Sequence, residues 1–228
     1  AYAERMPTAT ELYGFYLFNA QDGYDYLGNP ALKPEQSLQG EFRLQAQGKM
    51  ARISTTVFHH HINHFISGSI DPSFSTMTIG ALGVKKFSAL SYAQLSGVEA
   101  SLLLKPIAAL DMVSTLRYTK GKDNTGDPLP MIAPLKNIST VRYQFSRLFL
   151  QVETEAAAAQ NNVSQQYGED PTPGYFLLHL RSGFSFQLMG KKTDLQYGVE
   201  NLLDKNYHEH LDWGNVKRPG RNGYLMLK

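Results

Sequence analysis

Apolar and polar side chains alternate with a period of two along most of this chain, and this pattern limits the fold more than any other feature. Between residues 176 and 188, one parity carries apolar side chains such as Leu180 and Phe184, whereas the other carries polar ones such as His179 and Arg181. Similar alternation runs through residues 38–47, 98–105, 112–119, 141–145 and 194–200. Because side chains of a strand point alternately to opposite faces of the sheet, the pattern predicts an all-β protein.

The connections between these expected strands alternate in length. Short joins are expected at residues 47–50, 106–110, 146–147 and 190–192, and long ones at about residues 67–88, 121–136, 156–174 and 204–219. Strands of about ten residues with short turns at one end and long loops at the other are typical of an outer-membrane antiparallel barrel. A soluble β-sandwich, which also has alternating strands, is the alternative.

Two further features favour the membrane barrel. Charged side chains occupy the polar parity in mid-strand, which suits a water-filled lumen. These residues are Glu41, Arg43, Glu99, Arg117, Arg142, Arg181 and Glu200. Aromatic side chains gather near strand ends, as they do in the girdles at membrane interfaces. They are Tyr118, Tyr143, Tyr175, Phe176, Tyr197, Tyr207 and Tyr224. We therefore predict an antiparallel transmembrane β-barrel.

Composition excludes several other classes of protein. Hydrophobic residues make up 42% of the 228 residues and charged residues 18%, which excludes a disordered, highly charged chain. The 22 basic and 20 acidic residues are dispersed, so we expect no nucleic-acid partner. The sequence has no cysteine, which excludes disulfides, thiolate zinc sites and a cysteine nucleophile. No apolar run reaches the roughly 18 residues of a spanning helix.

Two groups of motifs lie near the two ends of the chain. The first comprises Arg5-Met-Pro-Thr, Thr10-Glu-Leu-Tyr-Gly and Gly28-Asn-Pro-Ala-Leu-Lys-Pro-Glu. The second comprises Gly198-Val-Glu-Asn-Leu-Leu-Asp-Lys-Asn-Tyr and Arg218-Pro-Gly-Arg-Asn. In order and spacing, these motifs resemble the receptor barrel of TonB-dependent outer-membrane transporters, and the resemblance covers essentially the whole chain.

We interpret the prolines of these motifs as structural residues that set the boundaries between loops and strands. Pro30 and Pro34 cannot donate to a strand ladder, so residues 29–35 are expected to form an extended loop segment that feeds a strand. Pro219 and Gly220 are expected to mark the return from a loop to a strand.

The resemblance implies that residues 1–228 are the C-terminal barrel segment of a receptor. The sequence holds nine full strands and the tail of a tenth, whereas plugged outer-membrane transporters have about 22. The plug domain and the first barrel strands are therefore expected upstream. Leu203 stands where the family usually has Phe, and the chain ends at Lys228 without the usual terminal aromatic, so a few further residues are expected to follow.

The resemblance also implies a function in the bacterial outer membrane. It predicts energised import of a scarce solute, powered by a TonB-type complex that engages the upstream region, and not an enzyme. Outer-membrane lipid and the transported ligand are the other expected partners, and no cofactor is expected. A metal ion or a siderophore-like metal chelate is the favoured substrate, with carbohydrate, cobalamin and peptide left open.

Two alternatives remain at this stage. One is a passive porin or structural barrel, which would lack an upstream plug. The other is a small outer-membrane hydrolase built from loop residues such as His208, His210, Asp212 and Ser164. The sequence has no Gly-x-Ser-x-Gly nucleophile motif to support the hydrolase.

The last long loop is our first choice for ligand contact. It holds His208, Glu209, His210, Asp212 and Trp213. Imidazole and carboxylate groups suit a borderline metal such as zinc or copper. Loop packing is the competing interpretation of the same residues.

A second histidine group lies between Phe58 and Phe65. If Arg52 and Thr56 face the lumen, alternation directs His60 and His64 inward and His59 and His61 outward. At most two of the four can then converge, so histidines at the level of the membrane interface are favoured over a metal site. His60 and His64 are retained as candidate ligand contacts. Met77, Met112 and Met131 have no metal-binding spacing and are expected to be packing or loop residues.

Overall fold

The main element of the protein is an antiparallel sheet of ten strands. The computed structural model describes residues 1–227, without the side chain of Trp213, and gives the order β1-β4-β5-β8-β9-β10-β11-β12-β13-β14. The strands are β1 (Tyr2–Arg5), β4 (Glu35–Gln47), β5 (Ala51–Asn63), β8 (Tyr92–Ile107), β9 (Leu110–Asp123), β10 (Lys136–Phe145), β11 (Leu148–Ala157), β12 (Tyr175–Leu188), β13 (Lys191–Glu200) and β14 (Asn222–Leu227). The nine strands after the four-residue β1 agree with the predicted count. The all-β, barrel-type prediction is confirmed.

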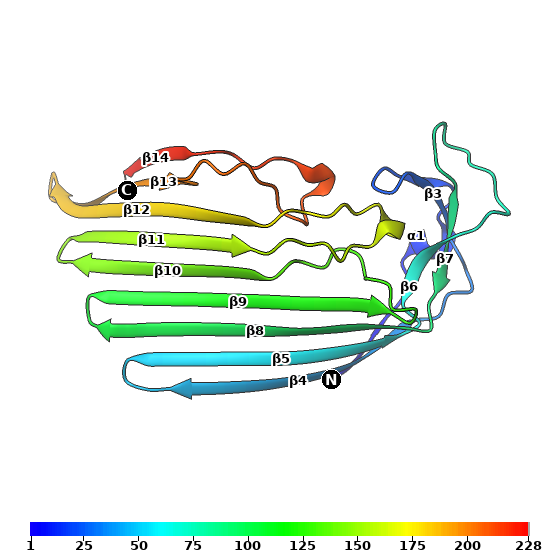
Figure 1. Cartoon of the computed structure of the whole chain (residues 1–228), viewed down its shortest axis with the longest axis horizontal. Helices are drawn as coiled ribbons and strands as arrows, with labels where there is room; N and C mark the ends of the chain where they lie inside the picture. Colours follow the sequence, from blue (N-terminus) through cyan, green and yellow to red (C-terminus); the bar gives the residue numbers. More distant parts are fainter. Residues whose placement is uncertain (228) are drawn as a thin grey trace.

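The predicted alternation of turns and loops is also confirmed. All the short turns lie at one end of the sheet and all the long connections at the other (Figure 1). The short turns are residues 48–50, 108–109, 146–147 and 189–190. In the last of them, Met189 and Gly190 have φ angles of 51° and 77°, which is the left-handed pair that a two-residue hairpin needs to match strand twist.

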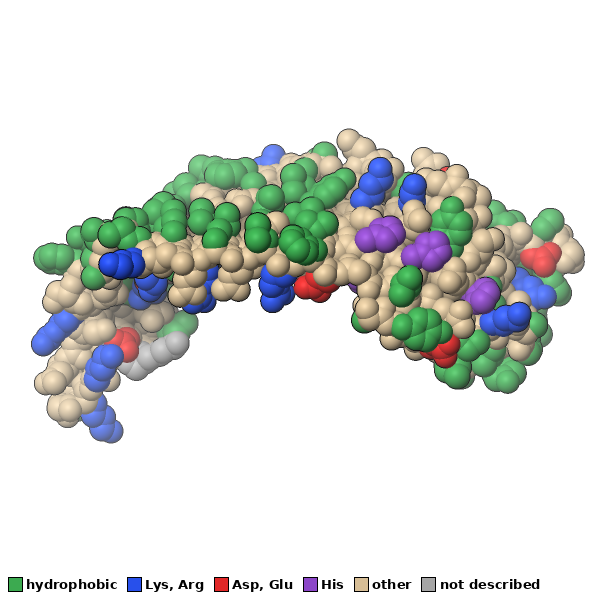
Figure 2. Space-filling model, turned by 90° about the horizontal axis from the view of Figure 1, so that it is seen from below, with side chains coloured by type: hydrophobic (Ala, Val, Ile, Leu, Met, Phe, Trp, Pro, Cys, Tyr) green, Lys and Arg blue, Asp and Glu red, His purple; other side chains and the backbone are tan. Residues whose placement is uncertain are grey.

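The two faces of the sheet differ in polarity, as the register shows. One continuous row of paired residues contains Thr56, Glu99 and Arg117, and the adjacent row on the other face contains Val57, Val98 and Tyr118. The sheet is curved, and hydrophobic side chains line its convex side (Figure 2). We call the sheet the wall, its apolar face the outer face, and its polar face the lumen face.

Apolar side chains of the outer face are widely exposed. Leu150, Phe184 and Tyr197 are 51%, 46% and 52% exposed. A contiguous exposed apolar surface of this kind marks an interaction face. Seven aromatic residues were predicted to form girdles, and four of them lie on the outer face. These four are Tyr118, Tyr143, Phe176 and Tyr197. The prediction was wrong for Tyr175 and Tyr224, which share the lumen face, and for Tyr207, which lies in a loop.

A second sheet caps the loop end of the wall and was not predicted. Its order is β2-β3-β7-β6, formed by β2 (Leu17–Asn19), β3 (Tyr24–Leu27), β7 (Val84–Ala89) and β6 (Ile66–Ile70). β3 and β7 pair in parallel, although 56 residues separate the end of one from the start of the other by the numbering. Residues 67–88 were expected to form a loop without strands, because these strands are too short to show a period of their own.

Three short helices complete the described chain: α1 (Ala9–Tyr13), η1 (Gln165–Tyr167) and η2 (Trp213–Asn215). α1 begins with a capping box in which the Thr8 hydroxyl accepts from the Glu11 amide and the Glu11 carboxylate accepts from the Thr8 amide. None of the helices in residues 1–227 is long and apolar enough to cross a membrane, a finding that concerns helical spans only.

The first motif group forms a junction between the wall and the loop end. The Arg5 guanidinium contacts both oxygens of Glu11 at 3.0 Å and Oε2 of Glu35 at 2.6 Å. Glu35 Oε1 accepts a hydrogen bond from the Ile66 amide at 2.8 Å. These contacts join β1, α1, β4 and β6 at one point.

The Gly28-Asn-Pro segment packs against α1. A Cβ on Gly28 would lie 2.6 Å from the backbone nitrogens of Tyr13 and Gly14, so only glycine fits there. The prediction that residues 29–35 are extended was only partly right, because Leu32 N donates to Asn29 O and closes a turn at Pro30. The strand does begin directly after Pro34.

Candidate functional site

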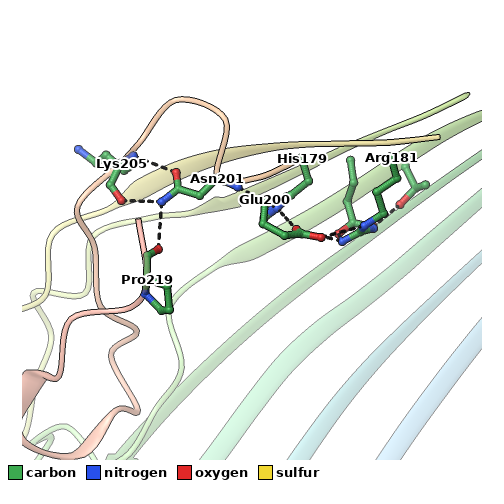
Figure 3. Close-up of polar contacts among 8 residues, drawn as sticks. His179, Arg181, Glu200, Asn201, Lys205 and Pro219 are labelled. Atoms are coloured by element: carbon green, nitrogen blue, oxygen red, sulfur yellow. Dashed lines mark hydrogen bonds and ion pairs between the residues drawn. The ribbon is translucent and has the colours of Figure 1, made fainter. Parts of the chain in front are cut away.

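The loop between β13 and β14, residues 201–221, is held closed by one asparagine. Asn201 Nδ2 donates to Lys205 O at 2.9 Å and to Pro219 O at 3.3 Å, and its Oδ1 accepts from Lys205 N at 2.9 Å (Figure 3). Asn201 N also donates to His179 Nδ1 on β12. Asn201, which is 3% exposed, therefore ties the two ends of the loop to each other and to the wall.

A second tie crosses the same loop. Asp204 Oδ1 accepts from the Arg221 amide at 2.8 Å, and Arg221 Nε donates to Leu202 O at 2.8 Å. Asn201 and Asp204 adopt φ angles of 48° and 54°, a region that Asn and Asp tolerate better than most residues. The second motif group thus fixes the base of the loop. Pro219 and Gly220 were predicted to mark the return from the loop to a strand, and β14 begins shortly after them, at Asn222.

Below the loop, a charge network lines the lumen face. Arg181 donates to Glu153 Oε2 at 2.9 Å and to Glu200 Oε1 at 3.0 Å, and Glu200 also contacts His179 (Figure 3). The four residues come from β11, β12 and β13, and they confirm that the polar parity of these strands forms one surface. The network stiffens the wall directly under the loop.

A pocket of about 180 Å³ lies where three loop segments meet. The segments are residues 20–21, 168–170 and 210–215, with Met131 at one side. Three carboxylate residues line it, namely Glu169, Asp170 and Asp212, together with His210 and Asn215. We call these five residues the loop pocket. His210 and Asp212 were predicted site residues, whereas Glu169 and Asp170 lie in the expected loop 156–174 and were not among the predicted site residues.

His210 is the central imidazole of the loop pocket. Its side chain is 3% exposed, with Nδ1 2.9 Å from Thr172 Oγ1 and Nε2 4.0 Å from Glu169 Oε1. Burial lowers the pKa of His210, and the nearby His208 adds to this, while the Glu169 carboxylate opposes it. The imidazole is therefore neutral at neutral pH and keeps a nitrogen lone pair.

The pocket carboxylates are also engaged in loop packing. Glu169 accepts from the backbone amides of Met131 and Ser164 at 2.5 and 2.9 Å. Asp212 accepts from Arg218 at 2.5 and 2.7 Å, and this pairing lowers the pKa of Asp212. Loop packing, the competing interpretation, therefore accounts for the observed contacts of Glu169 and Asp212.

The remaining predicted residues of the last loop point elsewhere. His208 is 9% exposed, and its Nδ1 has no hydrogen-bond partner among residues 1–227. Glu209 Oε1 lies 3.5 Å from Lys136 Nζ at the start of β10. In the described part of the chain, no three His, Cys, Asp or Glu side chains are grouped so that they could hold a metal ion. The side chain of Trp213 lies outside the described part.

The two histidines predicted to face inward have different positions. His60 shares the lumen face with Phe58, whose ring centroid is 5.3 Å away. His64 follows the end of β5 with a φ angle of 54°, so strand alternation does not govern its direction. Its Nδ1 is buried and has no partner within residues 1–227. Neither histidine lines the loop pocket.

The sequence model of the family described as "TonB dependent receptor-like, beta-barrel" matches residues 1–202. This chain belongs to that family. Family membership confirms the resemblance, with the first motif group inside the matched residues and most of the second group beyond residue 202, and it places the protein in the outer membrane. The outer face of the wall therefore faces lipid. In such barrels the short turns are periplasmic and the long loops extracellular.

Solved structures agree with this assignment. The chain is similar to the copper transporter OprC, with 22% identity and a TM-score of 0.80 over 99% of this chain and 35% of that one. It is also similar to the ferric enterobactin receptor PfeA of Pseudomonas aeruginosa (20% identity, TM-score 0.77, 99% and 36% covered). The siderophore receptor PirA of Acinetobacter baumannii gives 18% identity and a TM-score of 0.74 (99% and 37% covered).

These similarities show the fold, and the chain spans only about a third of the length of each structure. The similar proteins are transporters and receptors rather than enzymes. A search of curated proteins found no match to the sequence.

Proposed function

We propose that the receptor containing this chain imports a metal ion or a metal chelate across the outer membrane. The observation that carries the proposal is the loop pocket, where a neutral imidazole and three carboxylate residues line one opening at the extracellular end. Because no three of these side chains are grouped to hold a bare metal ion in the described residues, we expect them to contact the polar shell of a chelate or to add single ligands to a metal that keeps other ligands. The names of the similar structures, a copper transporter and siderophore receptors, support the same substrate class.

We further propose that residues 1–228 are the C-terminal barrel segment of this receptor, with a plug and further strands in other parts of the protein. The ten-stranded sheet is open, because its edge strands β1 and β14 do not pair with each other in the described residues. The coverage of about a third of each similar structure supports the same division.

Import on this scheme requires the ligand to favour one plug arrangement over another, since a ligand with equal affinity for both shifts nothing. The energising TonB-type complex then acts on the plug from the periplasm. The wall contributes a rigid support beneath the loops, through the network of Arg181 with Glu153 and Glu200.

The test is uptake by cells whose only copy of the receptor is the full-length protein. The probes are ⁶⁴Cu²⁺ and a ⁵⁵Fe³⁺–catecholate chelate. For at least one probe, the double variant His210→Ala/Asp170→Asn should raise the half-saturating concentration about tenfold, which corresponds to about 1.4 kcal/mol. The control Asn161→Ala, an exposed loop position outside the pocket, should leave it unchanged.

Two results would overturn the proposal. The first is a half-saturating concentration that is the same in the pocket variant and in the control for each of the two probes. The second is uptake that persists when the proton-motive force is collapsed, which would indicate a passive porin.

A further inference from the structure

The outer face of the wall carries a cluster of polar and basic residues near the loop end. Two adjacent rows of paired residues form it across β5, β8 and β9. The first row is His59, Ser96 and Lys120, and the second is His61, Gln94 and Lys122. We call these six residues the outer basic patch.

The patch lies at the upper edge of the apolar surface. The next row toward the periplasm is Val57, Val98 and Tyr118, and the one after it is Thr55, Ala100 and Leu116. The change from apolar to basic therefore occurs within one step of the register. Histidine side chains gather toward the loop end of the molecule in Figure 2, with Lys or Arg side chains near them. A position just above the hydrocarbon layer is the level of lipid headgroups.

The positive charges of the patch are not neutralised by the protein. Lys120 and Lys122 are exposed and form no ion pair within residues 1–227. The neighbouring Asp123 lies on the opposite parity, and its carboxylate accepts hydrogen bonds from Thr125 and the Asp127 amide. No acidic residue belongs to either row of the patch.

The histidines of the patch are held in place beside the lysines. His59 Nδ1 lies 2.8 Å from Ser96 Oγ. His61 Nε2 lies 3.1 Å from Asn63 Oδ1, and its ring stacks on Tyr92 with 5.0 Å between centroids. Two exposed ammonium groups beside these ordered polar side chains suit a ligand with several anionic oxygens.

We propose that the outer basic patch binds the phosphate groups of anionic lipid headgroups in the outer leaflet. The site faces the membrane rather than the lumen, so a membrane lipid reaches it by lateral diffusion. Lysine stems can lie along the apolar surface while their charged ends reach the phosphates. Basic residues near an anionic membrane surface each add to the attraction.

The experiment uses the full-length receptor in phosphatidylcholine nanodiscs. Diphosphorylated lipid A and its phosphate-free form are added as probes, and the bound lipid is quantified by native mass spectrometry. The double variant Lys120→Gln/Lys122→Gln should bind lipid A on the order of tenfold more weakly than the unaltered receptor. The phosphate-free lipid should bind both proteins weakly and equally.

The matched control is Lys49→Gln/Lys191→Gln. It removes the same charge from exposed lysines at the short-turn end of the wall, so lipid A binding should not change. Heat-modified electrophoretic mobility checks that every variant is folded.

Equal binding of lipid A by the patch variant and the control would overturn the proposal. So would binding of the phosphate-free lipid as tight as that of lipid A, or full displacement of lipid A by millimolar inorganic phosphate, which would indicate a free-anion site. Metal uptake should be unaffected by the patch variant, which separates this proposal from the proposed function.

Discussion

The wall and the second sheet differ in which side chains they expose and which they bury. The wall exposes its large apolar residues on the outer face, and its mid-strand charges, such as Glu99 and Arg117, lie on the lumen face. The second sheet buries an ion pair, Lys85 with Asp22, in which each side chain is 1% exposed and the two charged atoms are 2.6 Å apart. This difference fits a wall whose outer face contacts lipid and an extracellular sheet that buries apolar residues such as Leu27 and Val84 away from water.

The buried pair is well satisfied by its surroundings. Tyr26 Oη donates to Asp22 Oδ2 at 2.6 Å, and Lys85 Nζ lies 4.4 Å from the centroid of the Tyr24 ring and donates to Gln166 O. Burial, together with the Asp22 carboxylate, raises the pKa of Tyr26. Removing one partner of such a pair leaves the other charge buried without compensation.

The largest expected effect follows from that pair. Lys85→Met should destabilise the loop end by about 3–5 kcal/mol. The control Lys105→Met breaks a pair with Asp111 that is 2.8 Å long but 55% and 45% exposed, and it should cost less than about 1 kcal/mol. Limited proteolysis of residues 64–91 in outer membranes measures the difference, and equal protease sensitivity in the two variants would show that burial does not distinguish the regions.

A second substitution tests the outer face of the wall. Leu102→Arg places a charge against lipid and should destabilise the barrel by about 2–4 kcal/mol near the membrane midplane. Ser101→Arg, one residue away on the lumen face, should cost little. Unfolding in urea from lipid vesicles gives both values. If the serine variant were the less stable one, the assignment of the two faces would be reversed.

A third substitution tests the tie at the base of the last loop. Asn201→Ala removes the contacts with Lys205 and Pro219 and should cost about 1–3 kcal/mol. Asn161→Ala, at an exposed position, is the control. Hydrogen exchange of residues 201–221 should accelerate only in the Asn201 variant.

The smallest expected effect concerns pH. Because burial lowers the pKa of His210, the unfolded loop binds more protons than the folded one just below the ordinary histidine pKa. The stability of the loop pocket is therefore complete above that pKa and falls as the medium is acidified. The protection of the amides of residues 204–219, measured as the exchange rate relative to that of an unstructured amide at the same pH, should fall from about pH 7.5 to 5.5, and His210→Gln should reduce this dependence. If the His210→Gln variant showed a pH response of equal size, the response would belong to a titratable group other than His210.

The wall was predictable from the sequence because its strands are long enough to show their period. Arg181 and Leu180 could be assigned to opposite faces from their parity alone, and the register agrees. The second sheet was not predictable, since β2 and β3 have three and four residues and β3 finds its partner β7 far along the chain. Alternation carries no information about such pairing.

The candidate site was predictable only in part, for a similar reason. His210 and Asp212 share a loop and could be selected by residue type, but Glu169 and Asp170 come from another loop. His208 and Glu209 were selected with them, although the chain turns their side chains toward other partners. His64 was placed by alternation beyond the point where β5 ends.

The central claim is that the wall crosses the outer membrane with its long loops outside. The 228 residues contain no cysteine, so single cysteines at Asn161, Met189, Leu102 and Ser101, in a receptor with any other cysteine replaced by serine, can report on it. In intact cells expressing the full-length receptor, a membrane-impermeant maleimide should label the cysteine at 161 at once and that at 189 only after permeabilisation. In purified outer membranes, it should label position 101 and spare position 102. Labelling of 189 with protection of 161 in intact cells, or of 102 in place of 101, would contradict the account.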